Sequence, residues 1–221
     1  MFYSVRTGCQ WGHLPRTYPK FNSVYDHYRK GCRDGTWARI NATLGRIIRH
    51  AVGREATPSA AVLDSQSVKT TEVGGVRGYD AGKKVNGRKR HILVDTMGNL
   101  LLVVVHAADI QDRDGAKLVL NAMPTALWSR MVCIWADGGY RGALIQWVKT
   151  TFAVVLSIIL RSDGAKGFVV LPKRWVVERT FAWLGHYRRL SKEYEQLLEN
   201  SVGMVYLASI HRLLRYFYPA H

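Results

Sequence analysis

Three of the sixteen acidic residues lie where a carboxylate is unfavourable unless it binds a cation. Asp64 ends the apolar run AAVLD and Asp137 ends MVCIWAD, whereas Glu178 interrupts the apolar stretch RWVVERTFAWL. The two runs are typical of buried strands, and α/β sheets bind ligands at the carboxyl ends of strands. A buried carboxylate without a cation is strongly disfavoured. Because Mg²⁺ and Mn²⁺ prefer carboxylate oxygens, the three acids predict a divalent-metal site.

Other candidates near these acids are weaker. Asp95 also ends an apolar run, but the MGN that follows is typical of a hairpin turn, so we expect a structural role. Ser65 and Ser67 lack the G-x-S-x-G setting and the paired histidine of a serine nucleophile.

The surroundings of Glu178 carry positive charge. At 100° per residue, a helix over residues 174–192 has one face made of Arg174, Glu178, Phe181, Gly185, Arg188, Arg189 and Lys192. One acid within a basic stripe suits a place where a metal ion meets a phosphodiester. The alternative is an ordinary amphipathic helix with an Arg174–Glu178 pair. The two strand-end aspartates favour the site.

A second basic segment, GGVRGYDAGKKVNGRKR, covers residues 74–90 and is predicted to be an exposed loop or ribbon. Its cations are Arg77, Lys83, Lys84, Arg88, Lys89 and Arg90. Cations of one sign repel one another unless a partner neutralises them, so we expect contacts with DNA phosphates. A solvated loop is the alternative.

The overall composition agrees with a polyanionic partner. Lys and Arg number 32 against 16 Asp and Glu, which gives a net charge of +16. Nucleic acid explains this excess better than an anionic membrane surface. The longest apolar runs, residues 100–105 and 152–160, are far shorter than the ~20 residues of a spanning helix. With no secretory signal and no C-x-x-C spacing among the three cysteines, we expect a cytoplasmic protein.

Two regions are expected to position these residues. Residues 1–55 are predicted to be helical, with helices over 23–31 and 36–53 joined by a turn at Asp34-Gly35. Such a pair suits DNA binding, although an ordinary helical hairpin is the alternative. EATPSA, residues 55–60, is the predicted linker. Residues 60–221 are expected to form the catalytic domain.

The second region mixes strands with helices. Strands are predicted at 60–64, 91–95, 100–107 and 131–137, and helices at 113–123, 140–149, 174–192 and 201–217. This alternation predicts an α/β fold with a mixed sheet flanked by helices.

Several segments then identify a family. LDSQSVKT (63–70), DAGKKVNGRKRHILVDTMG (80–98), ADIQDRDGA (108–116), ADGGYRG (136–142) and the stretch 167–195 resemble the DDE transposases of bacterial insertion sequences, in the group of insertion sequence five. The resemblance implies a ribonuclease-H-like core, two Mg²⁺ or Mn²⁺ ions and the triad Asp64, Asp137 and Glu178. In the related signature Y-x2-R-x3-E-x6-K, Arg174 and Glu178 match, whereas Leu171 and Gly185 replace the tyrosine and the lysine.

The resemblance also implies a function. We expect hydrolysis of double-stranded DNA at transposon-end inverted repeats, followed by transfer of the 3′-hydroxyl into target DNA. A homodimer is expected because two ends must meet, and a nucleoid-associated location in a bacterium follows. Relatives precede MFYSVRTGCQW with further residues, so the expectation is a chain shortened at its start. The alternatives are a nuclease that cuts without joining, and a non-catalytic or degenerate DNA-binding protein.

Overall fold

A computed structural model describes residues 1–160 and 173–218. Its described part contains one six-stranded mixed sheet. The strands are β1 (Ala60–Lys69), β2 (Gly78–Asp80), β3 (Val85–Asp95), β4 (Leu100–Ala107), β5 (Cys133–Ala136) and β6 (Val155–Ile158). β3 pairs antiparallel with β1, β2 and β4, whereas β5 runs parallel to both β1 and β6.

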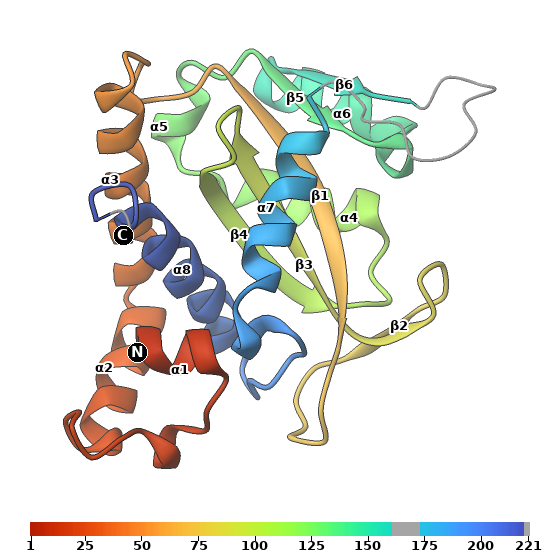
Figure 1. The fold of residues 1–221 in the computed structure, drawn as a ribbon. Coiled ribbons are helices and arrows are strands. Elements are labelled where there is room, and N and C mark those ends of the chain that lie inside the picture. Colours follow the sequence, from red (N-terminus) through yellow and green to blue (C-terminus); the bar gives the residue numbers. More distant parts are fainter. Residues whose placement is uncertain (161–172, 219–221) are drawn as a thin grey trace.

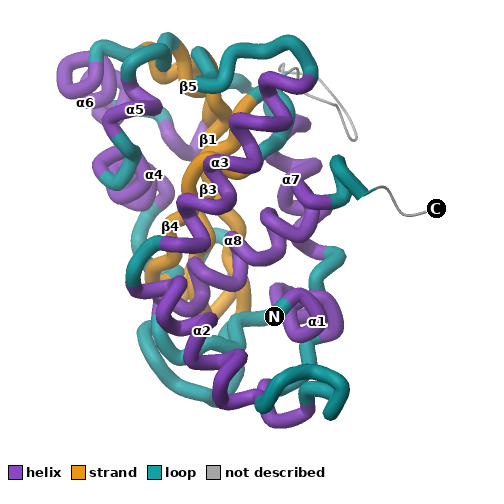
Figure 2. The backbone as a smooth tube through the Cα atoms, turned by 90° about the vertical axis from the view of Figure 1, so that its left-hand side faces the viewer, coloured by secondary structure: helices purple, strands orange, loops and turns teal. Residues whose placement is uncertain are grey.

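Helices cover both faces of this sheet (Figures 1 and 2). Those on one face are α4 (Asp112–Asn121) and α6 (Ala143–Phe152), and those on the other are α3 (Thr36–Ala51), α7 (Trp175–Gly185) and α8 (Leu198–Leu214). The alternation of β1 divides the core: Ala61 and Leu63 pack toward α4 and α6, whereas Val62 packs toward α7 and α8. Among the described residues, no helix combines the length and apolarity needed to cross a bilayer.

The remaining elements complete the described part of the chain. They are α1 (Phe2–Thr7), α2 (Phe21–Arg33), α5 (Thr125–Trp128) and three single-turn 3₁₀ helices, η1 (Trp11–His13), η2 (Gly138–Tyr140) and η3 (Arg188–Leu190). The sequence analysis predicted a helical region over residues 1–55, which contains α1, but it did not predict α5, β2 or β6. These elements are short, and short segments have weak periodicity.

The strand that carries Asp64 is longer than predicted. β1 does not end at Asp64, because β3 stays paired with it as far as Lys69. The parallel pairing with β5, by contrast, covers only Ala60–Val62. Asp64 therefore lies just beyond the point where β5 leaves β1.

The predicted helical hairpin exists, with a different boundary. α2 continues through Gly31, because this glycine is where the indole of Trp37 packs: a Cβ there would lie 2.4 Å from Trp37 Cε2. Asp34 forms the turn, since its carboxylate accepts hydrogen bonds from the Thr36 amide (2.9 Å) and hydroxyl (2.6 Å).

This hairpin shares the core of the sheet region. The Tyr28 hydroxyl donates to the carbonyl of Asn200 in α8. Asn41 donates to the Leu100 carbonyl at 2.7 Å and accepts from the Ser209 hydroxyl at 2.7 Å. The segments before and after residues 55–60 therefore pack together in one unit.

The Glu178 helix is shorter than predicted. α7 ends at Gly185, and Tyr187 adopts extended backbone angles (φ −97°, ψ 108°) before η3 begins. The prediction of one basic helical face through residue 192 is therefore wrong: Arg188, Arg189 and Lys192 lie beyond the helix. The physical reason is a buried pair between Arg189 and Glu195 at 2.8 Å, which turns the chain away from the helix axis.

Candidate active site

The sheet register brings the two predicted aspartates together. Val62 lies opposite Trp135 in the parallel pair of β1 and β5, and Asp64 and Asp137 each follow two residues later. Each aspartate accepts a backbone amide with its Oδ1 atom, Asp64 from Ser65 (2.7 Å) and Asp137 from Gly139 (2.8 Å). The Oδ2 atoms are left to face the interior of the site.

Glu178 reaches the same place from α7. One nitrogen of the Arg174 guanidinium lies 3.9 Å from Asp64 Oδ2, 3.8 Å from Asp137 Oδ2 and 3.3 Å from Glu178 Oε1. The structure therefore assembles the three predicted acids around a single positive group. The predicted Arg174–Glu178 pair is also present.

Asp95 is excluded from this group. Its fully buried carboxylate pairs with Arg49 at 2.8 Å and accepts the amides of Met97 (2.8 Å) and Asn99 (2.9 Å). Those contacts close the hairpin between β3 and β4, as the MGN sequence predicted.

The electrostatics of the triad favour a cation. Burial, reinforced by the nearby charge of Asp137, raises the pKa of Asp64 to about 6, although the Ser65 amide and Arg174 oppose this shift. Three ionised carboxylates around one guanidinium leave a net charge of −2. In the described residues, no three metal-binding side chains lie close enough to share one ion as they stand. The guanidinium of Arg174 lies within 3.9 Å of all three carboxylates.

Comparison with known families decides the identity. The model described as "Transposase DDE domain" matches residues 55–213, which is well over half of the chain. A second model, "Putative transposase of IS4/5 family", matches residues 1–41. The chain belongs to the DDE transposases of the IS4/IS5 type.

A curated relative agrees with this assignment. This transposase is 28% identical over 116 residues to the "Putative transposase for insertion sequence element IS402" of Burkholderia cepacia. The match covers 50% of this chain and 54% of the relative, so the chain spans about half the length of the curated relative that it matches. The sheet with helices on both faces is the ribonuclease-H-like fold of the DDE domain, as the resemblance implied. DDE transposases as a family use divalent metal ions.

The predicted basic loop is only partly a surface loop. Arg77, Lys83 and Lys84 are exposed, at or near the hairpin of β2 and β3. Lys83 reaches toward the triad of the transposase, where its Nζ atom donates to the Ser65 carbonyl at 3.2 Å. These three cations lie where DNA phosphates can reach them.

The remaining three cations of that segment are buried, which corrects their prediction as exposed. Arg88, Lys89 and Arg90 belong to β3 and are at most 5% exposed. Lys89 lies between Asp80 (3.4 Å) and Asp112 (3.1 Å). The physical reason is that β3 is central in the sheet, so helices or loops cover both of its faces.

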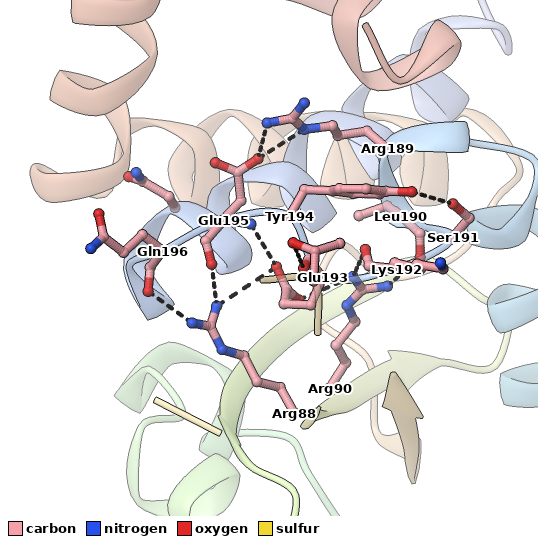
Figure 3. Close-up of polar contacts among 12 residues, drawn as sticks. Arg88, Arg90, Arg189, Leu190, Ser191, Lys192, Glu193, Tyr194, Glu195 and Gln196 are labelled. Atoms are coloured by element: carbon pink, nitrogen blue, oxygen red, sulfur yellow. Dashed lines mark hydrogen bonds and ion pairs between the residues drawn. The ribbon is translucent and has the colours of Figure 1, made fainter. Parts of the chain in front are cut away.

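Arg88 and Arg90 contact residues 190–196 (Figure 3). Alternation along β3 directs Lys89 to the opposite face, where it pairs with Asp80 and Asp112. Arg88 donates to the carbonyls of Val76, Glu195 and Gln196 at 2.7 to 2.8 Å. Glu193 pairs with Arg90 at 3.1 Å and lies 3.7 Å from Arg88. We call this group the arginine cluster; its charged members are Arg88, Arg90, Arg189, Glu193 and Glu195.

The arginine cluster fixes η3 and the segment that follows it. Within it, Arg188 and Lys192 are exposed, whereas Arg189 is 9% exposed and buried against Glu195. The predicted phosphate-contacting set therefore divides into surface cations and structural cations. Leu171, at the tyrosine position of the signature, lies outside the described residues. Gly185, at the lysine position, has open space around its Cα.

One acidic residue near the triad escaped the sequence analysis. Asp112 opens α4, and its Oδ1 atom accepts the Ser65 hydroxyl at 2.9 Å. Its motif, ADIQDRDGA, was noticed only for its resemblance. A first-turn aspartate is also a common helix-start residue, so nothing in the sequence distinguished it from one.

Proposed function

We propose that this chain hydrolyses DNA phosphodiesters at the inverted repeats of its element and transfers the freed 3′-hydroxyl into target DNA. The observation that carries the proposal is the convergence of Asp64, Asp137 and Glu178 on one guanidinium nitrogen, within 3.9 Å. These acids come from β1, from the residue after β5 and from α7, which are far apart in the sequence. A protein that only binds DNA has no need to gather negative charge beside its basic surface.

In this proposal, Asp64, Asp137 and Glu178 hold two Mg²⁺ or Mn²⁺ ions. When bound, such ions activate water near neutral pH and stabilise the leaving oxygen of a phosphodiester. The protein keeps the aspartate Oδ2 atoms turned inward by giving both Oδ1 atoms a backbone amide. Arg174 is then free to leave the carboxylates and contact a DNA phosphate, because its guanidinium is flanked by them without a short hydrogen bond.

The DNA would follow the exposed cations. We propose phosphate contacts for five exposed residues, Arg77, Lys83, Lys84, Arg188 and Lys192, and for Arg174, whose side chain is 18% exposed at the triad. Exposed arginines of the N-terminal hairpin, such as Arg33, Arg39 and Arg46, extend the same basic character and support a DNA-binding role for residues 1–55. Arg88, Lys89, Arg90 and Arg189 support this surface from within.

Two copies would act together on one element. Two transposon ends must be cut in concert, and a closed two-fold dimer is the simplest assembly that holds two equivalent ends. We place this dimer in the bacterial cytoplasm, on the nucleoid, where its substrate lies.

The deciding experiment is the Asp64→Asn variant. This change preserves shape and removes the negative charge, so cleavage of a duplex that carries the terminal repeat should fall by a factor of about a thousand or more in Mn²⁺. Binding of the same duplex should persist. Asp114→Asn is the matched control, since Asp114 is exposed and pairs only with Lys117 at 3.2 Å. An Asp64→Asn variant as active as wild type would remove Asp64 from the active site. Cleaved ends without joined product would favour the nuclease.

The pH dependence of the free energy of unfolding of the same variant shows whether it is folded. In the folded protein the pKa of the Asp64 carboxyl is about 6, above its ordinary value of 3.8, so the group keeps its proton up to about that pH. The free energy of unfolding without metal therefore falls as pH rises from about 4 to 6. Above pH 6, Asp64→Asn should be more stable than wild type by up to about 3 kcal/mol, and the difference should vanish below about pH 4. Urea unfolding in EDTA measures this.

A further inference from the structure

Asp112 stands beside the proposed triad without belonging to it. It opens α4, and its side chain is 29% exposed, so it lies at the rim of the site. A Cβ built on Gly139 would lie 3.1 Å from Asp137 Oδ1 and 3.6 Å from Asp112 Oδ2. Both carboxylates therefore lie beside the backbone of Gly139. This closeness places Asp112 next to the reacting region.

The contacts of Asp112 lead to Asp64 through one residue. Ser65 is buried; its hydroxyl donates to Asp112 Oδ1 at 2.9 Å, and its amide donates to Asp64 Oδ1 at 2.7 Å. The second contact occupies Oδ1 and turns Oδ2 toward Arg174. Because Ser65 follows Asp64 directly, a shift of its backbone would rotate the Asp64 carboxylate.

The same serine receives an exposed cation. Lys83 Nζ lies 3.2 Å from the Ser65 carbonyl and 3.4 Å from its hydroxyl oxygen. This contact holds a lysine of the hairpin between β2 and β3 at the edge of the triad. Ser65 therefore connects an acidic ligand and a phosphate-binding candidate.

Asp112 is itself held firmly in its ionised form. Lys89, only 5% exposed, lies 3.1 Å from its Oδ1 atom and donates to the Ile110 carbonyl at 2.9 Å. Burial opposes ionisation of Asp112, but Ser65 and Lys89 outweigh it and keep its pKa below the usual value. His91 Nε2 lies 3.9 Å away, and burial together with His106 lowers the pKa of His91 to about 3, so this ring is neutral.

We propose that Asp112 is a positioning residue of the active site: it fixes Ser65, which orients Asp64 toward the metal ions and holds Lys83 beside the scissile phosphate. This inference rests on the proposed function, because it assigns a role relative to that triad. It also explains the buried Lys89, which keeps Asp112 charged and in place. Groups that orient metal ligands in this way typically change metal affinity or activity by about 10- to 100-fold when removed.

The test measures Mn²⁺ binding by calorimetry and the cleavage of a terminal-repeat duplex under saturating DNA. Asp112→Ala and Ser65→Ala should each weaken Mn²⁺ binding by about tenfold or more and lower kcat, with little change in DNA affinity. The double variant should be no worse than either single one, because both break the same contact. Asp112→Asn keeps an oxygen acceptor for Ser65 and should recover much of the loss. Asp114→Ala, two residues along the same helix, should behave as wild type.

The possible outcomes distinguish failure of the positioning role of Asp112 from failure of the proposed function. Loss of thermal stability in Asp112→Ala, with Mn²⁺ affinity and kcat unchanged in it and in Ser65→Ala, would show a purely structural role and overturn the proposal. Additive losses in the double variant would also overturn it, because the two residues would then act separately. If Asp64→Asn bound Mn²⁺ as tightly as wild type does, both the proposed function and the role of Asp112 would be overturned.

Discussion

Two groups of charged residues in this protein combine arginine with carboxylates but differ in how tightly their members are held. The arginine cluster holds three arginines and two glutamates at no more than 9% exposure, with pairs as short as 2.8 Å. The triad gathers three carboxylates around Arg174, with distances of 3.3 to 3.9 Å and up to 43% side-chain exposure. The first group makes short, directed hydrogen bonds, including three from Arg88 to carbonyl oxygens. The second has no such bond between Arg174 and its carboxylates.

The difference shows how charge can serve structure or function. A buried charged group holds a fold when its hydrogen-bonding atoms find partners, and removing one partner then leaves another charge unpaired. A group with excess charge and loose contacts stays able to exchange its partner. The arginine cluster meets the first description and the triad meets the second. The two groups should therefore respond in opposite ways to similar substitutions.

The largest contrast should come from two Glu→Ala changes. Glu193→Ala leaves Arg88 and Arg90 buried without their carboxylate, so it should lower the free energy of unfolding by about 3 to 5 kcal/mol. Glu178→Ala removes a half-exposed acid from a like-charged group and should be close to neutral without metal. Urea denaturation of both variants in EDTA makes the comparison. Equal destabilisation by Glu193→Ala and Glu178→Ala would show that the arginine cluster and the triad do not differ in this way.

A smaller effect is expected at Arg174. Arg174→Gln removes the positive charge that now lies among the carboxylates, so the metal-free protein should lose about 1 kcal/mol of stability while Mn²⁺ binds several-fold more tightly. Calorimetry with Mn²⁺ and thermal unfolding in EDTA measure the two changes. Arg188→Gln, at an exposed arginine beyond α7, is the control. Weaker Mn²⁺ binding in Arg174→Gln would mean that Arg174 organises the site and does not compete for it.

The smallest effect concerns the surface cations. Lys83→Ala with Lys84→Ala should reduce the salt dependence of DNA binding, with the slope of log K against log salt flattening by up to about 2. Folding should be unaffected, because both side chains are exposed. Lys30→Ala, at an exposed lysine of the N-terminal hairpin, shows whether that hairpin shares the same DNA. An unchanged slope in the double variant would mean that DNA does not contact Lys83 or Lys84.

Much of the fold could be predicted from local patterns. The strand at residues 100–107 has the predicted bounds, and the hairpin turn after Asp95 follows from MGN. Runs of β-branched residues between glycines and acids identify buried strands because few other structures tolerate them. The strand end at Asp64 was wrong because pairing with β3, which no local pattern encodes, carries β1 on to Lys69.

The candidate site shows the same division. Asp64, Asp137 and Glu178 could be chosen from the sequence because each acid interrupts or ends an apolar run, where an unpaired charge is unfavourable. Asp112 could not, because its role depends on Ser65 and Lys89, 47 and 23 residues earlier in the chain.

The sequence by itself determined most of the longer strands and helices, which acids are unfavourable to bury, and which family the chain resembles. Only the tertiary structure decided where each cation points. Alternation in β3 places Arg88 and Arg90 on one face and Lys89 on the other, whatever the surroundings. Whether those faces meet solvent depends on residues 188–196 and on α4, which are distant in sequence and pack across them. Burial is a property of the assembled chain, so only the tertiary structure distinguishes the charges that we propose to bind DNA from those that stabilise the fold.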